Sequence, residues 1–144
     1  VIEHLYNPEE FIEKLHQSLR PKQTVIVSTG NIGFIIVRLM LLFGYFNYGE
    51  RGILDSTHTR LFTFQSFKKL LTSQFEIKLI KGIPPPYPLS IGNNIYSKTL
   101  LKINNLLIKI YKSLFSYQIY MILKPKITIE HILKDTEKNS KYNN

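Results

Sequence analysis

The sequence predicts a single α/β domain in which helices connect the strands of one sheet. Short β-rich runs alternate along the chain with stretches that have the 3.6-residue apolar period of helices. The 144 residues are 44% hydrophobic, which is enough for one packed core and argues against a disordered chain. Alternation of this kind is typical of sheets with crossover helices. The expected order is strand end, helix, strand, helix, long loop, helix, strand, helix, strand.

The N-terminal elements are read from caps and apolar runs. Residues 1–5 are interpreted as the last turn of a strand whose beginning lies upstream. A helix is expected next, because Asn7 can cap it, Pro8 suits its first position and Glu10 can complete a capping box. Residues 24–29, TVIVST, are β-rich and apolar on both faces. This pattern is typical of a buried parallel strand.

The middle of the chain holds two predicted helices separated by a long loop. Residues 32–43 read as a helix that is apolar nearly all round; with Arg38 at its centre, the apolar run is too short for a bilayer span. A glycine-containing loop is expected over 44–62. Thr63 can cap the following helix. Residues 75–82 alternate apolar and polar, which predicts a strand exposed on one face.

The C-terminal third carries most of the basic surplus, with 9 basic and 3 acidic residues after position 95. An amphipathic helix is expected over 96–114, followed by a strand over 115–123. Residues 127–144 are expected to form a short helix and a disordered tail. The predicted apolar face of the amphipathic helix consists of Leu100, Ile103, Leu107, Ile110 and Leu114. Its opposite face carries Lys98, Lys102, Lys109 and Lys112.

Composition excludes several classes of function. The absence of cysteine excludes disulfides, thiolate metal sites and a cysteine nucleophile, and it fits a reducing compartment such as the cytoplasm. The net charge of +9 invites a nucleic-acid interpretation. However, Lys outnumbers Arg 15 to 4 and alanine is absent, which indicates AT-rich coding bias. Arg makes most bidentate base and phosphate contacts, so we expect no nucleic-acid partner.

Four segments, in order, resemble class I S-adenosylmethionine-dependent methyltransferases. They are residues 1–11 (VIEHL, then NPEEF), residues 19–31 (LRP, then VIVSTGN), residues 48–63 (YGERGILDSTHTRLFT) and residues 114–118 (LFSYQ). The match runs from about residue 1 to 126. The segment 48–63 is the specific part and is similar to a subgroup often found with, or fused to, glycosyltransferases.

This resemblance implies a Rossmann-like methyltransferase sheet, from the end of the fourth strand to the seventh, with an inserted amphipathic helix. The family's glycine-rich loop, D/E-x-G-x-G-x-G, does not occur among the seven glycines of the sequence, and the ribose-binding acid is also missing. Residues 1–126 are therefore interpreted as the C-terminal part of a methyltransferase domain, which we expect to be inactive alone. The implied cofactor is S-adenosylmethionine, with Val1, Ile2 and Glu3 beside it.

The implied catalytic residues are His58, Asp55 and His4. Asp55 and His58 are three apart in one loop, where a carboxylate could orient an imidazole that acts as a base. The alternative is a loop-bracing network in which Arg60 pairs with Asp55. The residues expected to bind the acceptor are Asn31, Tyr48 and Arg60. For Asn31 the alternative role is to cap the next helix.

Two function hypotheses remain open. The first is methyl transfer to a small-molecule, glycan or lipid-intermediate acceptor. The second is a non-catalytic interaction module that docks on a membrane surface or on a glycosyltransferase partner. Peripheral membrane contact through the basic amphipathic helix is left open beside a solvated Lys face. No metal is expected, because a His-x-x-x-His pair is absent and adjacent Glu3 and His4 would diverge on a strand.

Overall fold

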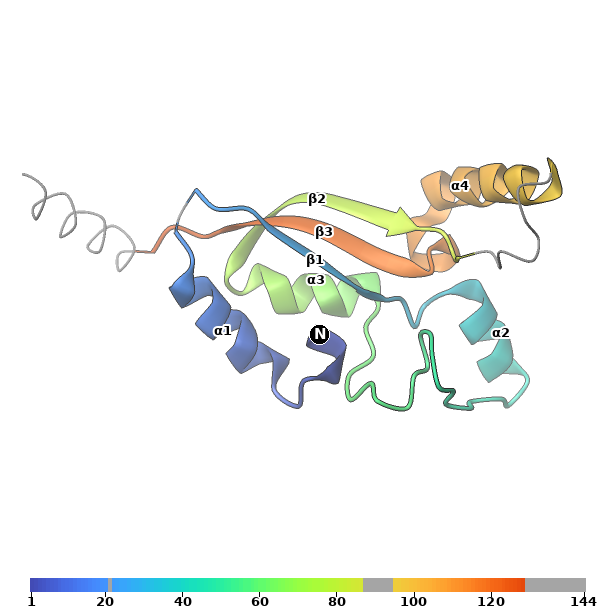
Figure 1. Cartoon of the computed structure of the whole chain (residues 1–144), viewed down its shortest axis with the longest axis horizontal. Helices are drawn as coiled ribbons and strands as arrows, with labels where there is room; N and C mark the ends of the chain where they lie inside the picture. Colours follow the sequence, from blue (N-terminus) through green and yellow to red (C-terminus); the bar gives the residue numbers. More distant parts are fainter. Residues whose placement is uncertain (21, 87–94, 129–144) are drawn as a thin grey trace, which may run out of the picture.

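The computed structural model describes residues 1–20, 22–86 and 95–128 and contains one three-stranded sheet with helices packed around it (Figure 1). In chain order the elements are the 3₁₀ helix η1 (Ile2–His4), α1 (Pro8–Ser18), β1 (Val25–Gly30), α2 (Ile35–Leu42), α3 (Phe64–Thr72), β2 (Phe75–Ile83), α4 (Ile95–Phe115) and β3 (Gln118–Pro125). The α/β class is confirmed at this level. The predicted C-terminal helix and tail lie almost entirely outside the described residues.

The sheet has the strand order β1-β3-β2, and β3 is antiparallel to both neighbours. β1 and β2 therefore run in the same direction on either side of β3. In the register, Val25 pairs with Leu123 and Gly30 with Gln118. β2 and β3, which α4 separates in the sequence, are antiparallel neighbours.

The prediction that residues 24–29 form a buried parallel strand is right about the extended backbone but wrong about its burial and its neighbour. Among the described strands, β1 pairs with β3 alone, in antiparallel orientation, and Ile26 is 60% exposed. The β-branched run correctly predicts extended backbone, because branched side chains fit a pleated surface. It does not reveal which neighbour the strand has. One edge of β1 has no partner strand in the part of the chain that is described.

The prediction that residues 1–5 end a strand is also wrong. Two backbone hydrogen bonds of the 3₁₀ type close η1. A strand needs a hydrogen-bonded neighbour, but the carbonyl oxygen of Glu3 instead accepts the backbone N–H groups of Thr59 and Arg60. The resulting turn brings residues that would alternate on a strand to the same side of the chain.

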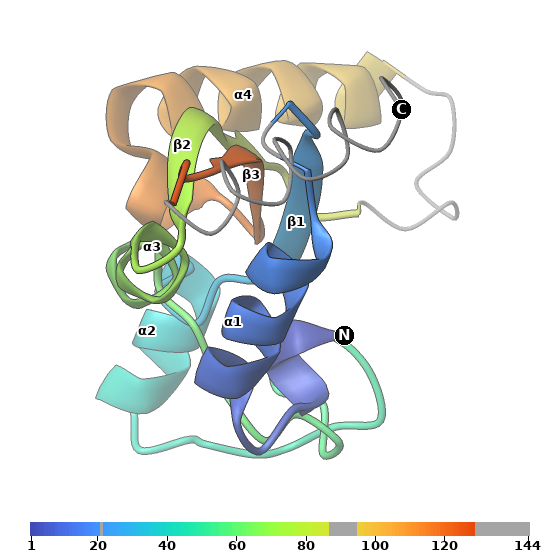
Figure 2. The same ribbon diagram turned by 90° about the vertical axis from the view of Figure 1, so that its left-hand side faces the viewer.

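Helices α1 and α3 cover one side of the sheet, while α4 lies on the other side (Figures 1 and 2). The predicted caps are present: the Asn7 side chain accepts the Glu10 N–H at the start of α1, and Thr63 and Ser66 form a capping box at the start of α3. The main core cluster under these helices consists of Ile2, Ile12, Val27, Phe62, Phe64, Phe67, Leu71, Phe75, Ile119, Met121 and Leu123.

The long loop between α2 and α3 is anchored by its own small core. Ile53 and Leu54 are buried against Phe34 and Val37. Gly52 has φ of 102°, a left-handed conformation that favours glycine, and it turns the chain into this anchor. The loop is therefore held on both sides, and the segment 53–60 lies beside η1.

Helix α4 is observed close to its predicted range, with a non-helical Tyr111 at φ −145° and ψ 80°. It packs on β2. Its predicted apolar face is only partly covered, because Ile103 is 50% and Ile110 is 72% exposed. Among the described helices, none combines the length and the apolar character needed to cross a bilayer.

Candidate functional site

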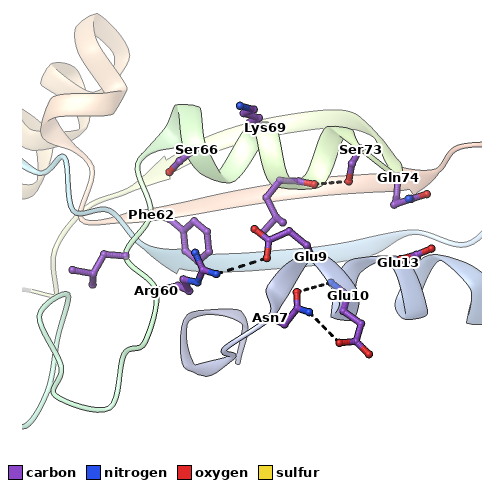
Figure 3. Close-up of a pocket in the computed structure, with 12 residues that line it drawn as sticks. Asn7, Glu9, Glu10, Glu13, Arg60, Phe62, Ser66, Lys69, Ser73 and Gln74 are labelled. Carbon is purple, nitrogen blue, oxygen red and sulfur yellow. Dashed lines mark hydrogen bonds and ion pairs between the residues drawn. The ribbon is translucent and has the colours of Figure 1, made fainter.

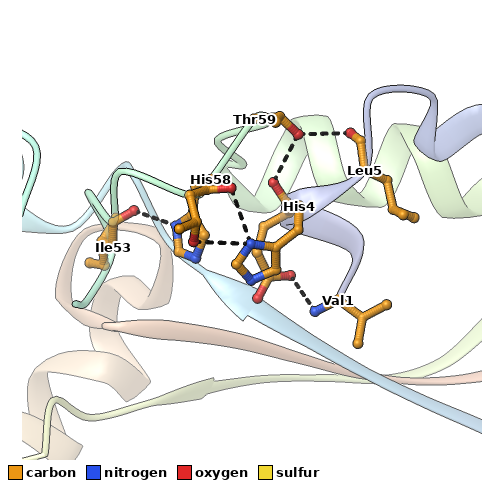
Figure 4. Close-up of polar contacts among 8 residues, drawn as sticks. Val1, His4, Leu5, Ile53, His58 and Thr59 are labelled. Carbon is orange, nitrogen blue, oxygen red and sulfur yellow. Dashed lines mark hydrogen bonds and ion pairs between the residues drawn. The ribbon is translucent and has the colours of Figure 1, made fainter. Parts of the chain in front are cut away.

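The site forms where η1 meets the loop 53–60, two segments more than fifty residues apart in the sequence. The hydroxyl of Thr59 donates to the carbonyl oxygens of Leu5 at 2.9 Å and Glu3 at 3.3 Å. The backbone N–H groups of Thr59 and Arg60 add bonds to Glu3 at 2.9 and 3.0 Å. These bonds fix the backbone on both sides of the site (Figure 4).

The ring of His58 is fixed by a backbone carbonyl. Its Nδ1 lies 3.0 Å from the oxygen of Ile53, which can only accept a hydrogen bond, so Nδ1–H donates and Nε2 keeps its lone pair. The predicted role of Asp55 as the group that orients this imidazole is wrong, because the Ile53 carbonyl has that position. His58 remains a competent base or ligand through Nε2.

The ring of His4 is fixed in the same way by Thr57. Its Nδ1 lies 3.1 Å from the Thr57 carbonyl oxygen and 3.2 Å from the Thr57 hydroxyl. That hydroxyl donates to Asp55 at 2.7 Å, so its oxygen is free to accept from His4. The His4 and His58 ring centroids are 4.8 Å apart with planes at 67°. Two imidazoles thus lie edge to face, each with its Nδ1 proton bound to the backbone.

Asp55 is an anion held by its own loop. The hydroxyl and the backbone N–H of Thr57 donate hydrogen bonds to the Asp55 carboxylate and hold its pKa below its usual range. Asp55 therefore stays ionised at neutral pH. It places a negative charge beside both imidazoles. Among the described residues, it makes no hydrogen bond to either ring.

Glu3 completes the site with a carboxylate that lacks a hydrogen-bond partner. Its Oε2 atom is buried and accepts no hydrogen bond, although the amino group of Val1 lies 3.3 Å away. One carboxylate oxygen of Glu3 and one nitrogen each of His4 and His58 all lie within 4.8 Å of one another. The expectation that Glu3 and His4 diverge is wrong, because η1 is a turn. Sequence reasoning missed this cluster because it assigned a strand to residues 1–5.

The predicted cofactor-binding residues differ in exposure. Val1 is 77% exposed and Glu3 is partly buried, but the side chain of Ile2 packs in the main core. Any contact of Ile2 with a cofactor would therefore use its backbone.

Asn31, predicted to bind the acceptor, is fully buried. Its side-chain nitrogen donates to the carbonyls of Ser113 and Ser116, and its oxygen accepts the N–H of Gly33. The alternative that it caps α2 is also wrong, since Phe34 occupies that cap position. Asn31 instead braces the end of β1 against the end of α4 through its side-chain nitrogen, while its side-chain oxygen closes an Asx turn with Gly33.

Arg60 lies at the mouth of a different cavity. Its guanidinium donates to the Tyr6 carbonyl at 3.2 Å and lies 4.0 Å from the Glu9 carboxylate, so the alternative pairing with Asp55 is not formed. The cavity is a groove of about 840 Å³ between α1 and α3 (Figure 3). The charged residues that line it are Glu9, Glu10, Glu13, Arg60 and Lys69. His4 and His58 are not among its lining residues.

Tyr48 lies on an exposed apolar surface at the end of α2 and in the following loop. Its ring packs edge to face on Phe46, with centroids 5.3 Å apart, and Tyr48 is 52% exposed. Other exposed apolar side chains of this surface are Leu39, Leu41, Leu42, Phe43 and Tyr45. The structure therefore separates Tyr48 from the groove that Arg60 lines.

Comparison of the chain with protein-family models gives no match, and a search of curated proteins gives none. The fold and site define a small α/β domain that presents two histidines and a partly buried carboxylate at one end of its sheet. Its function is inferred from this geometry and from the sequence motifs around it.

Proposed function

We propose that this domain is the C-terminal part of an S-adenosylmethionine-dependent methyltransferase and that its acceptor binds at His4 and His58. The observation that carries the proposal is the fixed tautomer of His58, whose Nε2 lone pair is available beside a second imidazole. The segment 48–63, which supplies His58, is also the segment with the most specific resemblance to the family.

The chemistry follows from what methyl transfer to a hydroxyl requires. Donor and acceptor must be aligned, and the acceptor proton must be removed. S-adenosylmethionine supplies the electrophilic methyl group when it is bound. In our proposal His58 Nε2 takes the acceptor proton, while the carbonyl of Ile53 stabilises the charged ring that results. The ring of His4, which packs edge to face on His58, positions the acceptor beside that base.

The residues present fit only one side of such a cofactor site. Glycines that bind a cofactor leave open space for its approach. Gly82, in contrast, is needed because Ser116 lies where its Cβ would be, and Gly30 packs against Ile53. We therefore propose that sequence outside these residues supplies the glycine-rich loop. The antiparallel pairing of β3 with β2 is compatible with the expected sheet but does not distinguish it from other α/β sheets.

The test compares this chain with the protein encoded by the natural reading frame, extended upstream of Val1. We expect the extension to contain the glycine-rich loop and titration calorimetry to show S-adenosylmethionine binding by the extended protein alone. Near-micromolar binding by this chain would contradict the division of the site. An extended protein with neither the loop nor binding would contradict the methyltransferase proposal itself.

A second candidate function is docking on an anionic membrane surface. The observation that favours it is the exposed apolar face of α4 together with Lys98, Lys102, Lys109 and Lys112, all of which are exposed. Each lysine near an anionic surface contributes about 1 kcal/mol, so four give weak, salt-sensitive association. Sedimentation with phosphatidylserine vesicles is the test. Binding that disappears at high salt and on changing the four lysines to Gln supports docking; its absence at low salt contradicts it.

A further inference from the structure

We propose that Glu3, His4 and His58 form a binding site for one divalent transition-metal ion. The three side chains converge from η1 and from the loop 53–60, and their ligand atoms lie within 4.8 Å of one another. Two imidazoles and one carboxylate are a donor set that first-row transition metals use in sites with open positions. The proposal concerns the same side chains as the proposed function, but it does not depend on methyl transfer.

The hydrogen bonds around both imidazoles are those of metal-ligating histidines. A metal-bound histidine donates its other ring N–H to a carbonyl or carboxylate, which fixes the tautomer and the ring orientation. His58 donates Nδ1–H to the Ile53 carbonyl and His4 donates Nδ1–H to the Thr57 carbonyl. Both rings therefore keep Nε2 for the ion. Figure 4 shows the rings of His4 and His58 next to each other, with Ile53 on the far side of His58.

The carboxylate of Glu3 provides an independent reason for a cation. A carboxylate oxygen that is withdrawn from water without a hydrogen bond is costly, and a bound cation reduces that cost. Glu3 Oε2 is buried and accepts no hydrogen bond, and the only ion pair it makes among the described residues is the 3.3 Å contact with Val1. A divalent ion would satisfy this oxygen and gain a charged ligand.

Asp55 and Thr57 form a supporting layer behind the ligands. Thr57 accepts from His4 and donates to Asp55, so a chain of hydrogen bonds connects a carboxylate to the first imidazole. Ionised Asp55 adds a second negative charge near the site. The charge of a divalent ion is thus opposed by two carboxylates, one as ligand and one behind it.

The distances require only a small adjustment. Zn–N bonds of about 2.0–2.1 Å at tetrahedral angles place ligand atoms roughly 3.4 Å apart. Side-chain rotations that move the ligand atoms by about 1 Å are therefore enough to bring them to this spacing. The exposure of His4 and the half-burial of His58 leave room for such a movement and for an entering ion. Mg²⁺ and Ca²⁺ prefer oxygen ligands, so the donor set favours ions such as Zn²⁺ or Co²⁺ over them.

The ion and the acceptor proton would compete for the same lone pair of His58. An ion at this position supplies a Lewis acid that lowers the pKa of a hydroxyl it binds. His58 would then act as a ligand, and deprotonation of the acceptor would depend on the ion. Metal binding thus distinguishes two mechanisms for the proposed reaction. With an ion bound, the ion activates the acceptor hydroxyl; without one, His58 removes its proton.

Calorimetric titration of Zn²⁺ into this chain, prepared without a histidine tag, tests the proposal. We expect one ion per chain, and at least about tenfold weaker binding for His4→Ala, His58→Ala and Glu3→Gln, since each removes a ligand. Glu13→Gln removes an exposed carboxylate and His16→Gln a core histidine as matched controls, and both are expected to retain binding. Binding that is absent, or that survives in the His4→Ala/His58→Ala double variant, would overturn the site.

A measurement on the wild-type chain guards against variants that fail to fold. Long-range ¹H–¹⁵N spectra of the histidine rings are expected to show Nδ1–H tautomers for His4 and His58, and large Nε2 shifts for these two rings on adding Zn²⁺. Shifts confined to the other histidines would refute the proposal. Because no methyl transfer is measured, a failure here leaves the proposed function standing, and a failure of methyl transfer leaves the metal site standing.

Discussion

In the loop 53–60 and the helix α4, how firmly the side chains are held is the reverse of how regular the backbone is. The loop has little regular structure, yet hydrogen bonds with η1 fix its backbone and the ring of His4, and the loop's own Ile53 carbonyl fixes the ring of His58. Helix α4 is the longest element, yet Leu106 is 60% and Ile110 is 72% exposed. The comparison teaches that side-chain order in this protein follows tertiary hydrogen-bond partners, because a helix satisfies its own backbone without fixing its surroundings.

The largest expected effect is on catalysis, from His58→Ala in the protein that includes the upstream sequence. A base that acts in the transition state contributes about 10²–10⁴-fold, so turnover is expected to fall by that factor while S-adenosylmethionine affinity changes little. Turnover and calorimetric affinity are compared per folded molecule. If His58 only braces the loop, the variant would lose thermal stability and keep wild-type turnover.

The next effect concerns the C-terminal end of α4, which Asn31 holds. Asn31→Ala removes the donors that satisfy the Ser113 and Ser116 carbonyls and the acceptor of the Gly33 N–H, and Asn31 itself is fully buried. Unsatisfied buried groups cost about 1–3 kcal/mol each, so we expect the free energy of unfolding to fall by about 3 kcal/mol. Urea denaturation followed by circular dichroism measures it.

The matched control for this variant is Asn47→Ala, which changes the same residue type at an exposed position. It is expected to stay within about 0.5 kcal/mol of the wild type. Equal losses for Asn31→Ala and Asn47→Ala would show that Asn31 does not brace β1 against α4.

A smaller effect is expected at the loop from Thr57→Val, which removes the hydroxyl that donates to Asp55. The pKa of Asp55 is lowered in the folded state, so its contribution to stability is present above the unfolded pKa of about 3.9 and is lost as the pH falls through the folded value. In the variant we expect the Asp55 pKa to rise toward its usual value. Carboxyl ¹³C titration by NMR measures the shift, with Thr24→Val as the control. An unchanged Asp55 pKa would contradict the hydrogen bond.

The smallest effect is expected on the exposed face of α4. Ile110→Gln replaces an apolar side chain that is 72% exposed by a good helix former, so the free energy of unfolding should change by no more than about 0.5 kcal/mol. If α4 docks on membranes, the same variant binds anionic vesicles more weakly. A loss of 2 kcal/mol or more, roughly that of a buried isoleucine, would mean that this face is covered.

Much of the local structure follows from the sequence alone. Asn7 and Pro8 predict the start of α1, Thr63 predicts the start of α3, and both caps are observed. The period of the apolar residues predicts α4 nearly to its ends. Caps and periodicity are short-range effects, in which the groups that interact lie within four residues of each other, so the sequence contains all the information they need.

The candidate site could be predicted only in part. The sequence singled out His4, Asp55 and His58, and all three lie together, but it connected Asp55 to His58 where Thr57 and Ile53 are the actual partners. It also separated Glu3 from His4 by assuming a strand. Backbone carbonyls carry no sequence signal, since every residue has one, so the groups that orient the rings were not predictable.

The sequence by itself determined the caps, most of the helical and extended segments, the absence of cysteine chemistry and the residue types available to the site. Only the tertiary structure decided that β3 lies between β1 and β2, that Asn31 is a buried brace, and that residues 1–5 turn so that Glu3 and His4 meet His58. The physical reason is distance along the chain. These arrangements depend on hydrogen bonds and packing between segments tens of residues apart, and only the folded chain brings those segments into contact.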